Sequence, residues 1–335
     1  MNIRKFIKTA LGVALVSTSL QVLAADRSIL NSSYDVAREL FAAYNELFAE
    51  HWHNKTGETV EINQSHAGSS AQAQAILQGL RADVVTYNQV TDINVLAERG
   101  NLLPSDWQSR LPNASSPFFS PPAFLVRKGN PKNIVDWDDL IRSDVSVVFP
   151  NPKTSGNGRY TYLAALGHAQ KAFPADESAQ REFLKTLLSR VAVFDTGGRG
   201  ATNTFVEREI GDVLISFESE VSNIAAEQAD KGYQVVVPKV SFKAEFPVAW
   251  LDRNVARNGT EAIAREYLEY LYSEEAQRLL ASFNYRVFSD TVTAENSDRF
   301  PPVELLTIDE ITGGWERATA EHFANGGQLD QLLAR

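Results

Sequence analysis

Short apolar runs alternate with longer amphipathic runs along most of this chain. The apolar runs predict strands at 60–62, 83–87, 124–126, 145–149, 191–194, 213–215, 233–237 and 246–250. The amphipathic runs predict helices at 71–80, 92–99, 136–141, 160–171, 178–188, 260–280 and, broken by glycine pairs, at 308–333. This alternation indicates an α/β fold with mostly parallel sheets flanked by helices. Ligands of such sheets bind beyond the carboxyl ends of the strands, where the helices begin.

The first segment has the pattern of a secretory signal peptide, which we place at residues 1–24. Residues 1–8 carry three basic residues and no acid, and an apolar stretch follows to Leu23. Small residues precede a cleavage point after Ala24 or Ala25. A membrane anchor is the weaker alternative, because polar residues interrupt a stretch that is already short for a span. We therefore expect a protein exported to a bacterial periplasm.

Charge and cysteine content exclude several classes of function. The chain has 42 acidic and 32 basic residues, a formal net charge of −10, and no cysteine. Such a surface repels nucleic acid and anionic lipid headgroups. The missing cysteines exclude disulfides, thiolate nucleophiles and cysteine-based metal sites. The histidines form no convincing metal site or catalytic group. We therefore expect that the protein binds no metal or cofactor and is not an enzyme.

Three junctions between a predicted strand and a predicted helix are rich in Ser, Thr, Asn and Gly. They lie at 64–70, 150–158 and 195–203. The start of a helix leaves its first N–H groups without intrahelical partners and carries the positive end of the helix dipole. Small residues let an anion approach these groups closely. Three such junctions predict that several helix starts converge on one small tetrahedral anion.

Each junction also has a plainer interpretation. Ser69 is a favoured helix cap in its own right, and the run from Thr154 to Gly158 could be only a glycine-rich turn. The glycines at 197, 198 and 200 resemble a dinucleotide fingerprint, but their spacing is wrong. Arg159 and Arg199 each follow a junction, where we expect them to brace the loop from behind. His66 lies inside the first junction, where a structural role is favoured.

Eight segments together resemble the periplasmic sulfate/thiosulfate-binding proteins, nearest to the thiosulfate-binding members. The likeness covers nearly all of the mature chain. It is carried by residues 30–36, 64–70, 82–89, 124–131, 150–156, 195–200, 211–220 and 322–327. The resemblance implies a two-lobed solute-binding fold of type II that closes about a hinge. It also implies delivery of the anion to an inner-membrane ABC permease for sulfur uptake. We expect the protein to be a monomer.

Extended crossings near 117–124 and 245–250 place the lobe boundaries. We expect one lobe to comprise residues 25–118 and 247–335, and the other to comprise 119–246. The resemblance further implies that the anion is held by neutral donors, mostly backbone N–H groups. Matched onto this chain, these donors belong to Ser69, Ser155, Gly156, Asn157 and Gly198. Asn157 and Gly198 stand where the sulfate-binding relatives have a Gly and an Ala, and backbone donors survive such changes.

Phe217 is the departure that bears on the ligand. The sulfate-binding relatives place a Trp indole N–H at this position, and a phenyl ring has no donor. A site for four oxygens would lose one hydrogen bond, worth about 1.5–3 kcal/mol with a charged partner. An apolar ring suits a polarisable sulfur atom, which favours thiosulfate, with sulfate as a second ligand.

Asp35 is the nearest candidate acceptor in a site expected to hold mainly donors, and we place it behind the contacting residues. A shell of donors would reject an oxyanion that carries a proton, such as phosphate.

The rival interpretation of the chain is an exported enzyme that acts on a sulfur or phosphorus oxyanion, which would need a nucleophile or a metal cluster.

Overall fold

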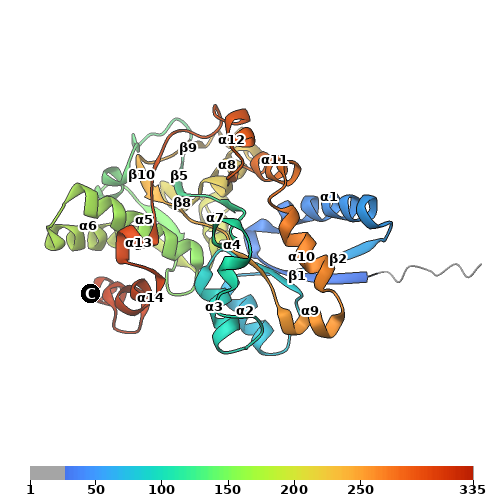
Figure 1. The fold of residues 1–335 in the computed structure, drawn as a ribbon. Helices are drawn as coiled ribbons and strands as arrows, with labels where there is room; N and C mark the ends of the chain where they lie inside the picture. The colour runs from blue at the N-terminus through green and yellow to red at the C-terminus, as the bar shows by residue number, and fades with distance from the viewer. Residues whose placement is uncertain (1–26, 335) are drawn as a thin grey trace, which may run out of the picture.

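The computed structural model describes residues 27–334, which form two large sheets, both with helices packed on them, and two short two-stranded sheets (Figure 1). The predicted signal peptide lies outside the described residues. The first sheet has the strand order β11-β3-β1-β2, and the second has the order β7-β6-β8-β5-β9. The strands of the first sheet are β1 (Arg27–Tyr34), β2 (Val60–Ala67), β3 (Val84–Thr86) and β11 (Val248–Trp250). Those of the second are β5 (Pro122–Val126), β6 (Val147–Pro150), β7 (Val191–Asp195), β8 (Val213–Phe217) and β9 (Gln234–Val236).

Helices connect the strands much as the sequence pattern predicts. Those packed with the first sheet are α1 (Arg38–Thr56), α2 (Ser69–Leu77), α3 (Val90–Glu98), α9 (Asp252–Asn258), α10 (Glu261–Tyr270) and α11 (Glu274–Ser282). Those packed with the second are α5 (Gly156–Ala172), α6 (Glu177–Ser189), α7 (Gly198–Val206) and α8 (Glu218–Glu227). The single helix expected at 260–280 is two helices, because the Ser273 hydroxyl caps α11 by accepting from Ala276 N at 3.2 Å.

Short elements complete the chain. They are η1 (Asp35–Ala37), η2 (Trp107–Arg110), α4 (Pro112–Ser115), β4 (Phe118–Phe119), η3 (Trp137–Ile141), η4 (Ala229–Lys231), β10 (Val240–Phe242), β12 (Arg286–Val287), α12 (Asp290–Glu295), β13 (Glu304–Leu306), α13 (Ile308–Thr312), α14 (Trp315–Ala318), η5 (Thr319–Phe323) and α15 (Gln328–Leu333). No helix between residues 27 and 334 combines the length and apolar character needed to cross a membrane.

The second sheet is mixed, which corrects the expectation of a mostly parallel sheet in each lobe. Strands β6, β7 and β8 run parallel, whereas β5 is antiparallel to both β8 and β9. The alternation of apolar and amphipathic runs predicts which segments are strands, but it carries no information on the direction of an edge pair. In the first sheet, β2, β1 and β3 are parallel and only β11 is reversed.

Two extended segments run side by side where the crossings between the lobes are expected. Ser120 N donates to Ala244 O at 2.9 Å, and Phe246 N donates to Phe118 O at 3.1 Å. The rings of Phe118 and Phe246 stack with centroids 5.3 Å apart. Two paired strands can bend together without loss of their mutual hydrogen bonds, which suits a hinge.

The C-terminal segment packs on α5, α6 and β10, so the structure contradicts its expected place in the first lobe. Strand β13 pairs with β10, Gln170 of α5 donates to Ile311 O at 3.0 Å, and Tyr162 of α5 contacts His322 at 2.9 Å. Leu329 and Leu332 of α15 are buried. The chain therefore crosses a third time after β12 and buries these apolar side chains on α5 and α6. The remaining lobe boundaries stay a prediction.

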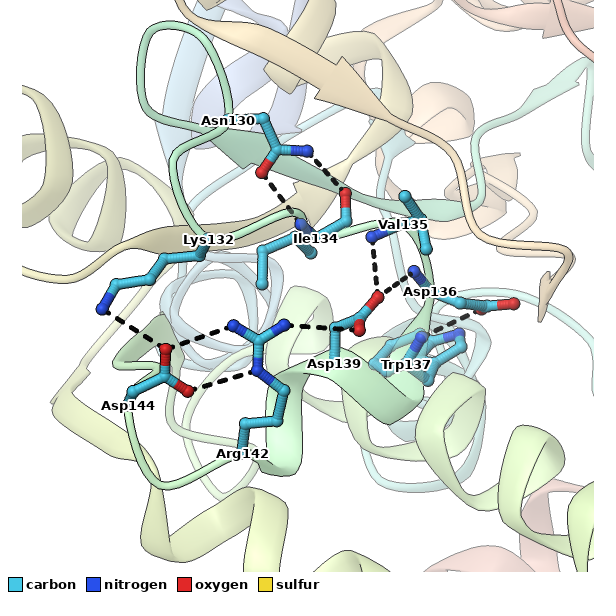
Figure 2. A network of polar contacts seen from close by, with 9 residues as sticks. All are labelled: Asn130, Lys132, Ile134, Val135, Asp136, Trp137, Asp139, Arg142 and Asp144. Atoms are coloured by element: carbon cyan, nitrogen blue, oxygen red, sulfur yellow. Dashed lines mark hydrogen bonds and ion pairs between the residues drawn. The ribbon is translucent and has the colours of Figure 1, made fainter.

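A polar network fixes the loop between β5 and β6 (Figure 2). Asp136 and Asp139 form a capping box at the start of η3, so its first N–H groups are satisfied. The indole of Trp137 packs beside β5, where it meets the Phe124 ring edge-on, and it donates to Val240 O at 2.8 Å. The surrounding bonds join Asn130, Lys132, Ile134, Val135, Arg142 and Asp144.

Candidate functional site

The three junctions singled out in the sequence meet at one small cavity between the two sheets. Its volume is about 20 Å³, and Ser69, Ser155 and Gly198 are among the residues that line it. A cavity of this size admits only a small occupant. Strands β2, β6 and β7 end beside it, and α2, α5 and α7 begin at it.

Each helix start presents backbone N–H groups to this cavity. Helix α2 begins at Ser69, α5 at Gly156 and α7 at Gly198. The N–H groups of Ser69, Gly156, Asn157 and Gly198 donate to no acceptor within residues 27–334. Such groups, together with three positive helix ends, form a neutral but strongly anion-attracting surface.

Local sequence explains why these helices begin where they do. Ser155 is extended, with φ −132° and ψ 130°, and its hydroxyl accepts from Gly158 N at 3.4 Å. It therefore caps α5 and keeps its O–H proton available. Gly197 is also extended and precedes α7. The hydroxyl of Ser69 donates to Asn88 Oδ1 at 2.7 Å, so its backbone N–H is its remaining donor.

Phe217 closes the cavity with an apolar wall. It ends β8, and its side chain is buried. Its ring packs against Phe246, with centroids 5.0 Å apart, and against Tyr160 at 6.0 Å. No N–H or O–H of this side chain can reach an occupant, so one side of the site is without a donor.

Asp35 lines the cavity, which corrects its expected place behind the contacting residues. It follows β1 as the first residue of η1, and its Oδ1 accepts from Val36 N at 3.1 Å. Its Oδ2 lies 3.5 Å from the point where a Cβ on Gly197 would stand. An acceptor is therefore present at the site, and the argument that a shell of donors excludes phosphate is weakened.

Arg159, Arg199 and His66 lie outside the cavity lining. Arg159 donates to Pro152 O at 3.2 Å, and Arg199 pairs with Glu39 of α1 at 3.6 Å. The His66 ring contacts Tyr34 O at 3.3 Å and the side chain of Gln64. Burial lowers the pKa of His66, which favours the neutral ring. These contacts tie Arg159 to the loop of the second junction, Arg199 to α1 and His66 to the end of β1, and the expected bracing roles stay a prediction.

The sequence pattern missed several lining residues. Val36 and Asn88, which lie outside the three junctions, line the cavity alongside the predicted ligands. Asn88 follows β3, and Val36 follows β1, so both lie at strand ends that meet the same edge of the first sheet. Their position just after β1 and β3 was the available signal in the sequence. These two strand ends lack the glycine that marked the three predicted junctions. Within residues 27–334, no cluster of three or more His, Cys, Asp or Glu is placed to hold a metal ion.

Comparison with known proteins defines the class. Residues 35–286 match the family model described as bacterial extracellular solute-binding protein. The chain therefore belongs to this family of solute-binding proteins. A periplasmic thiamin-binding protein shares the fold at a TM-score of 0.64 and 17% identity, over 92% of this chain and 97% of that structure.

Within this class, similar proteins carry two related names. The thiosulfate-binding protein of Escherichia coli strain K12 is 58% identical over 307 residues, 91% of each chain. The sulfate-binding protein of Salmonella typhimurium is 46% identical over 328 residues, 98% of this chain and 99% of that one. The solved sulfate-binding protein SubI of Mycobacterium tuberculosis matches with a TM-score of 0.78 and 32% identity, over 89% of this chain and all of that structure. The expected family and its two-lobed fold are confirmed.

Proposed function

We propose that this protein captures thiosulfate in the periplasm, with sulfate as a second ligand, and delivers it to the permease of an ABC transporter. The observation that carries the proposal is the convergence of unpaired N–H groups from three helix starts on one small cavity. The names of the similar thiosulfate- and sulfate-binding proteins support the same ligand class.

Neutral donors suit a dianion that must later be released. The N–H groups of Ser69, Gly156, Asn157 and Gly198, with the Ser155 hydroxyl, replace the hydration shell of the anion. The three helix dipoles add positive potential without a full charge. Closure of the lobes removes water, which strengthens each of these contacts. Because no Arg or Lys between residues 27 and 334 lines the cavity, no pairing of the anion with a cationic side chain has to be broken on release.

Phe217 directs the choice between the two anions. Thiosulfate has one terminal sulfur that is larger and a weaker acceptor than oxygen. Placed against the Phe217 ring, this sulfur loses no hydrogen bond, whereas a fourth sulfate oxygen would lose one. The site therefore favours thiosulfate, and isothermal titration of both anions tests this choice. Sulfate binding tenfold tighter than thiosulfate would overturn it.

Gly198→Pro tests the site itself. Gly198 is the first residue of α7, where proline is well tolerated, and the extended Gly197 suits a residue before proline. The substitution therefore removes the N–H with little cost to the helix. We expect a loss of affinity of about tenfold or more. Glu177→Pro, at the first residue of the remote helix α6, is the matched control and retains wild-type affinity. Unchanged affinity in Gly198→Pro would discard the assignment.

Binding rather than catalysis is the second part of the proposal. The similar proteins are named for binding, and among the described residues that line the cavity, Asp35 is the one charged group and no His, Lys, Arg or Tyr accompanies the hydroxyls. A monomer then suffices, since residues of one chain surround the cavity. Incubation of the purified protein with thiosulfate, followed by ion chromatography, tests the enzymatic alternative. Formation of sulfite or sulfide would support that alternative.

A further inference from the structure

A chain of hydrogen bonds leads from the cavity to a carboxylate that the binding site does not use. The buried side chain of Asn157, which lines the cavity, donates through Nδ2 to Ser216 Oγ at 2.7 Å. Ser216 in turn donates to Glu220 Oε2. Thr202 of α7 donates to the other oxygen, Oε1, at 2.7 Å. Ser216 therefore links Glu220 to Asn157, which forms part of the cavity wall.

Glu220 is close to the anion site in space as well. Its Oε2 lies 3.5 Å from the point where a Cβ on Gly198 would stand, and Asn157 Nδ2 lies 3.4 Å from that same point. A dianion bound to the N–H of Gly198 would thus be held by a residue that lies beside this carboxylate. Two like charges that are separated by protein atoms rather than by bulk water repel each other strongly.

Glu220 also faces a groove on the outer side of the cavity. This groove has a volume of about 310 Å³ and runs between α1 and the end of α11 on one side and α7 and α8 on the other. Glu220, Glu227 and Arg199 line it. A proton can therefore reach Glu220 from solvent without passing through the anion cavity.

The charges around Glu220 offer little compensation for a second negative group. Asp35 of η1 and Glu39 of α1 face it from the first lobe, Glu227 lies on its own helix, and Arg199 lies on α7. Tyr34 and Tyr285 lie nearby and are held together by a 2.8 Å bond between their hydroxyls. Arg199 is the one base among the described residues that line the groove, and it is already paired with Glu39 at 3.6 Å.

We propose that Glu220 takes up a proton from solvent when a dianion enters the cavity, so that binding of the anion is coupled to protonation of this residue. The inference rests on the proposed function. The new O–H bond forms on the Glu220 carboxylate, and the buffer supplies the proton through the groove. Ser216 and Asn157 carry the effect, so Glu220 acts as a positioning residue with no contact to the anion.

The direction of the existing pKa shift agrees with this coupling. Burial raises the pKa of Glu220, and the negative charge of Asp35 raises it further. The hydrogen bonds from Ser216 and Thr202 and the charge of Arg199 oppose this shift. A dianion bound nearby raises the pKa of Glu220 further, because its negative charge favours the neutral acid. The complex then binds more protons than the free protein, so affinity falls as pH rises through the window between the two pKa values of Glu220.

Titration calorimetry with thiosulfate in buffers of different ionisation enthalpy tests the inference. Measurements from about pH 5 to about pH 8 count the protons taken up on binding. We expect wild-type protein to take up a fraction of one proton, with a maximum inside this range, and Glu220→Gln to take up almost none while still binding thiosulfate. Glu227→Gln, in the same groove, is the matched control and keeps the wild-type uptake.

Further variants keep the test decisive if Glu220→Gln does not fold. Thr202→Val removes a donor that favours the ionised carboxylate, so the maximum of proton uptake moves to higher pH. Zero uptake in wild-type protein that binds thiosulfate would overturn the inference and leave the proposed function intact. Uptake that persists in Glu220→Gln but is lost in Asp35→Asn would assign the proton to Asp35 and also overturn it. Absence of heat with every sulfur oxyanion would instead overturn the proposed function.

Discussion

Arg286 and Glu218 form a bidentate ion pair that joins β12 to the start of α8. Arg286 Nε lies 2.6 Å from Glu218 Oε2, and Nη2 lies 2.8 Å from Oε1. The two side chains are 13% and 3% exposed. Arg286 also donates to Pro301 O at 2.7 Å. Because β12 pairs with β4 in the crossing region, this ion pair fixes α8 and the strand before it against the hinge.

Breaking this pair leaves a charge without its partner in a largely dry site. We expect Glu218→Gln to lower the free energy of unfolding by about 3–5 kcal/mol, the usual cost when one member of a buried pair is removed. Urea unfolding measures the change. Glu295→Gln breaks the exposed pair with Arg278, whose side chains are 43% and 46% exposed, and should cost less than about 1 kcal/mol. Equal costs for the two variants would show that the hinge pair does not stabilise the fold.

Phe217→Trp is expected to shift selectivity toward sulfate. An indole N–H at this wall restores a donor for a fourth oxygen, and a hydrogen bond to an anion contributes about 1.5–3 kcal/mol. The ratio of sulfate to thiosulfate affinity should rise by about tenfold or more. Phe217→Leu removes the ring without adding a donor, so it lowers both affinities and leaves the ratio near the wild-type value. Calorimetry with both anions measures the ratio, and an unchanged ratio in Phe217→Trp refutes the role of the missing donor.

The junctions at Ser69, Gly156 and Gly198 could be predicted because each combines a strand end, small polar residues and a helix start. Parallel strands bring their carboxyl ends to one edge of a sheet, so the sequence order implies the spatial cluster. The place of Asp35 could not be predicted in this way. It follows a strand, but it is flanked by Tyr34 and Val36, and nothing in this local pattern separates a lining residue from a plain helix start.

Long-range packing accounts for the other differences. The direction of β5 depends on pairing with β8 and β9, which are distant in sequence. The C-terminal segment lies on the second lobe because the apolar faces of α13 and α15 fit α5 and α6, and an amphipathic pattern shows that a face is buried but not its partner. The link from Asn157 to Glu220 depends likewise on side chains that only the folded chain brings together.

Gly156→Ala is expected to hold the lobes apart. A Cβ at Gly156 would lie 2.6 Å from Gln89 Cγ and 2.7 Å from Asn88 Oδ1, both on the opposite lobe. Because separation of the predicted lobes would relieve this clash, we expect a loss of thiosulfate affinity of roughly tenfold or more, with the free energy of unfolding changed by less than about 1 kcal/mol. Small-angle scattering should show a smaller ligand-induced decrease in the radius of gyration.

Gly68→Ala is the matched control for this test. Gly68 also lines the cavity, at the cap of α2, but a Cβ there would meet nothing within 4 Å. The variant should therefore close on thiosulfate as the wild type does. Wild-type affinity in Gly156→Ala would mean that the lobes do not approach as closely in the complex as this contact requires.

His322 should make stability depend on pH. It contacts the Tyr162 hydroxyl through Nδ1 at 2.9 Å, and burial lowers its pKa. Between this lowered value and the unfolded value of about 6.5, the unfolded chain binds more protons. The free energy of unfolding therefore falls as pH falls below about 6.5, by at most about 1.4 kcal/mol per pH unit, and this loss ends at the folded pKa. Urea unfolding at several pH values should show a smaller slope in His322→Asn than in wild type. Equal slopes in the two proteins would assign the pH dependence to other groups.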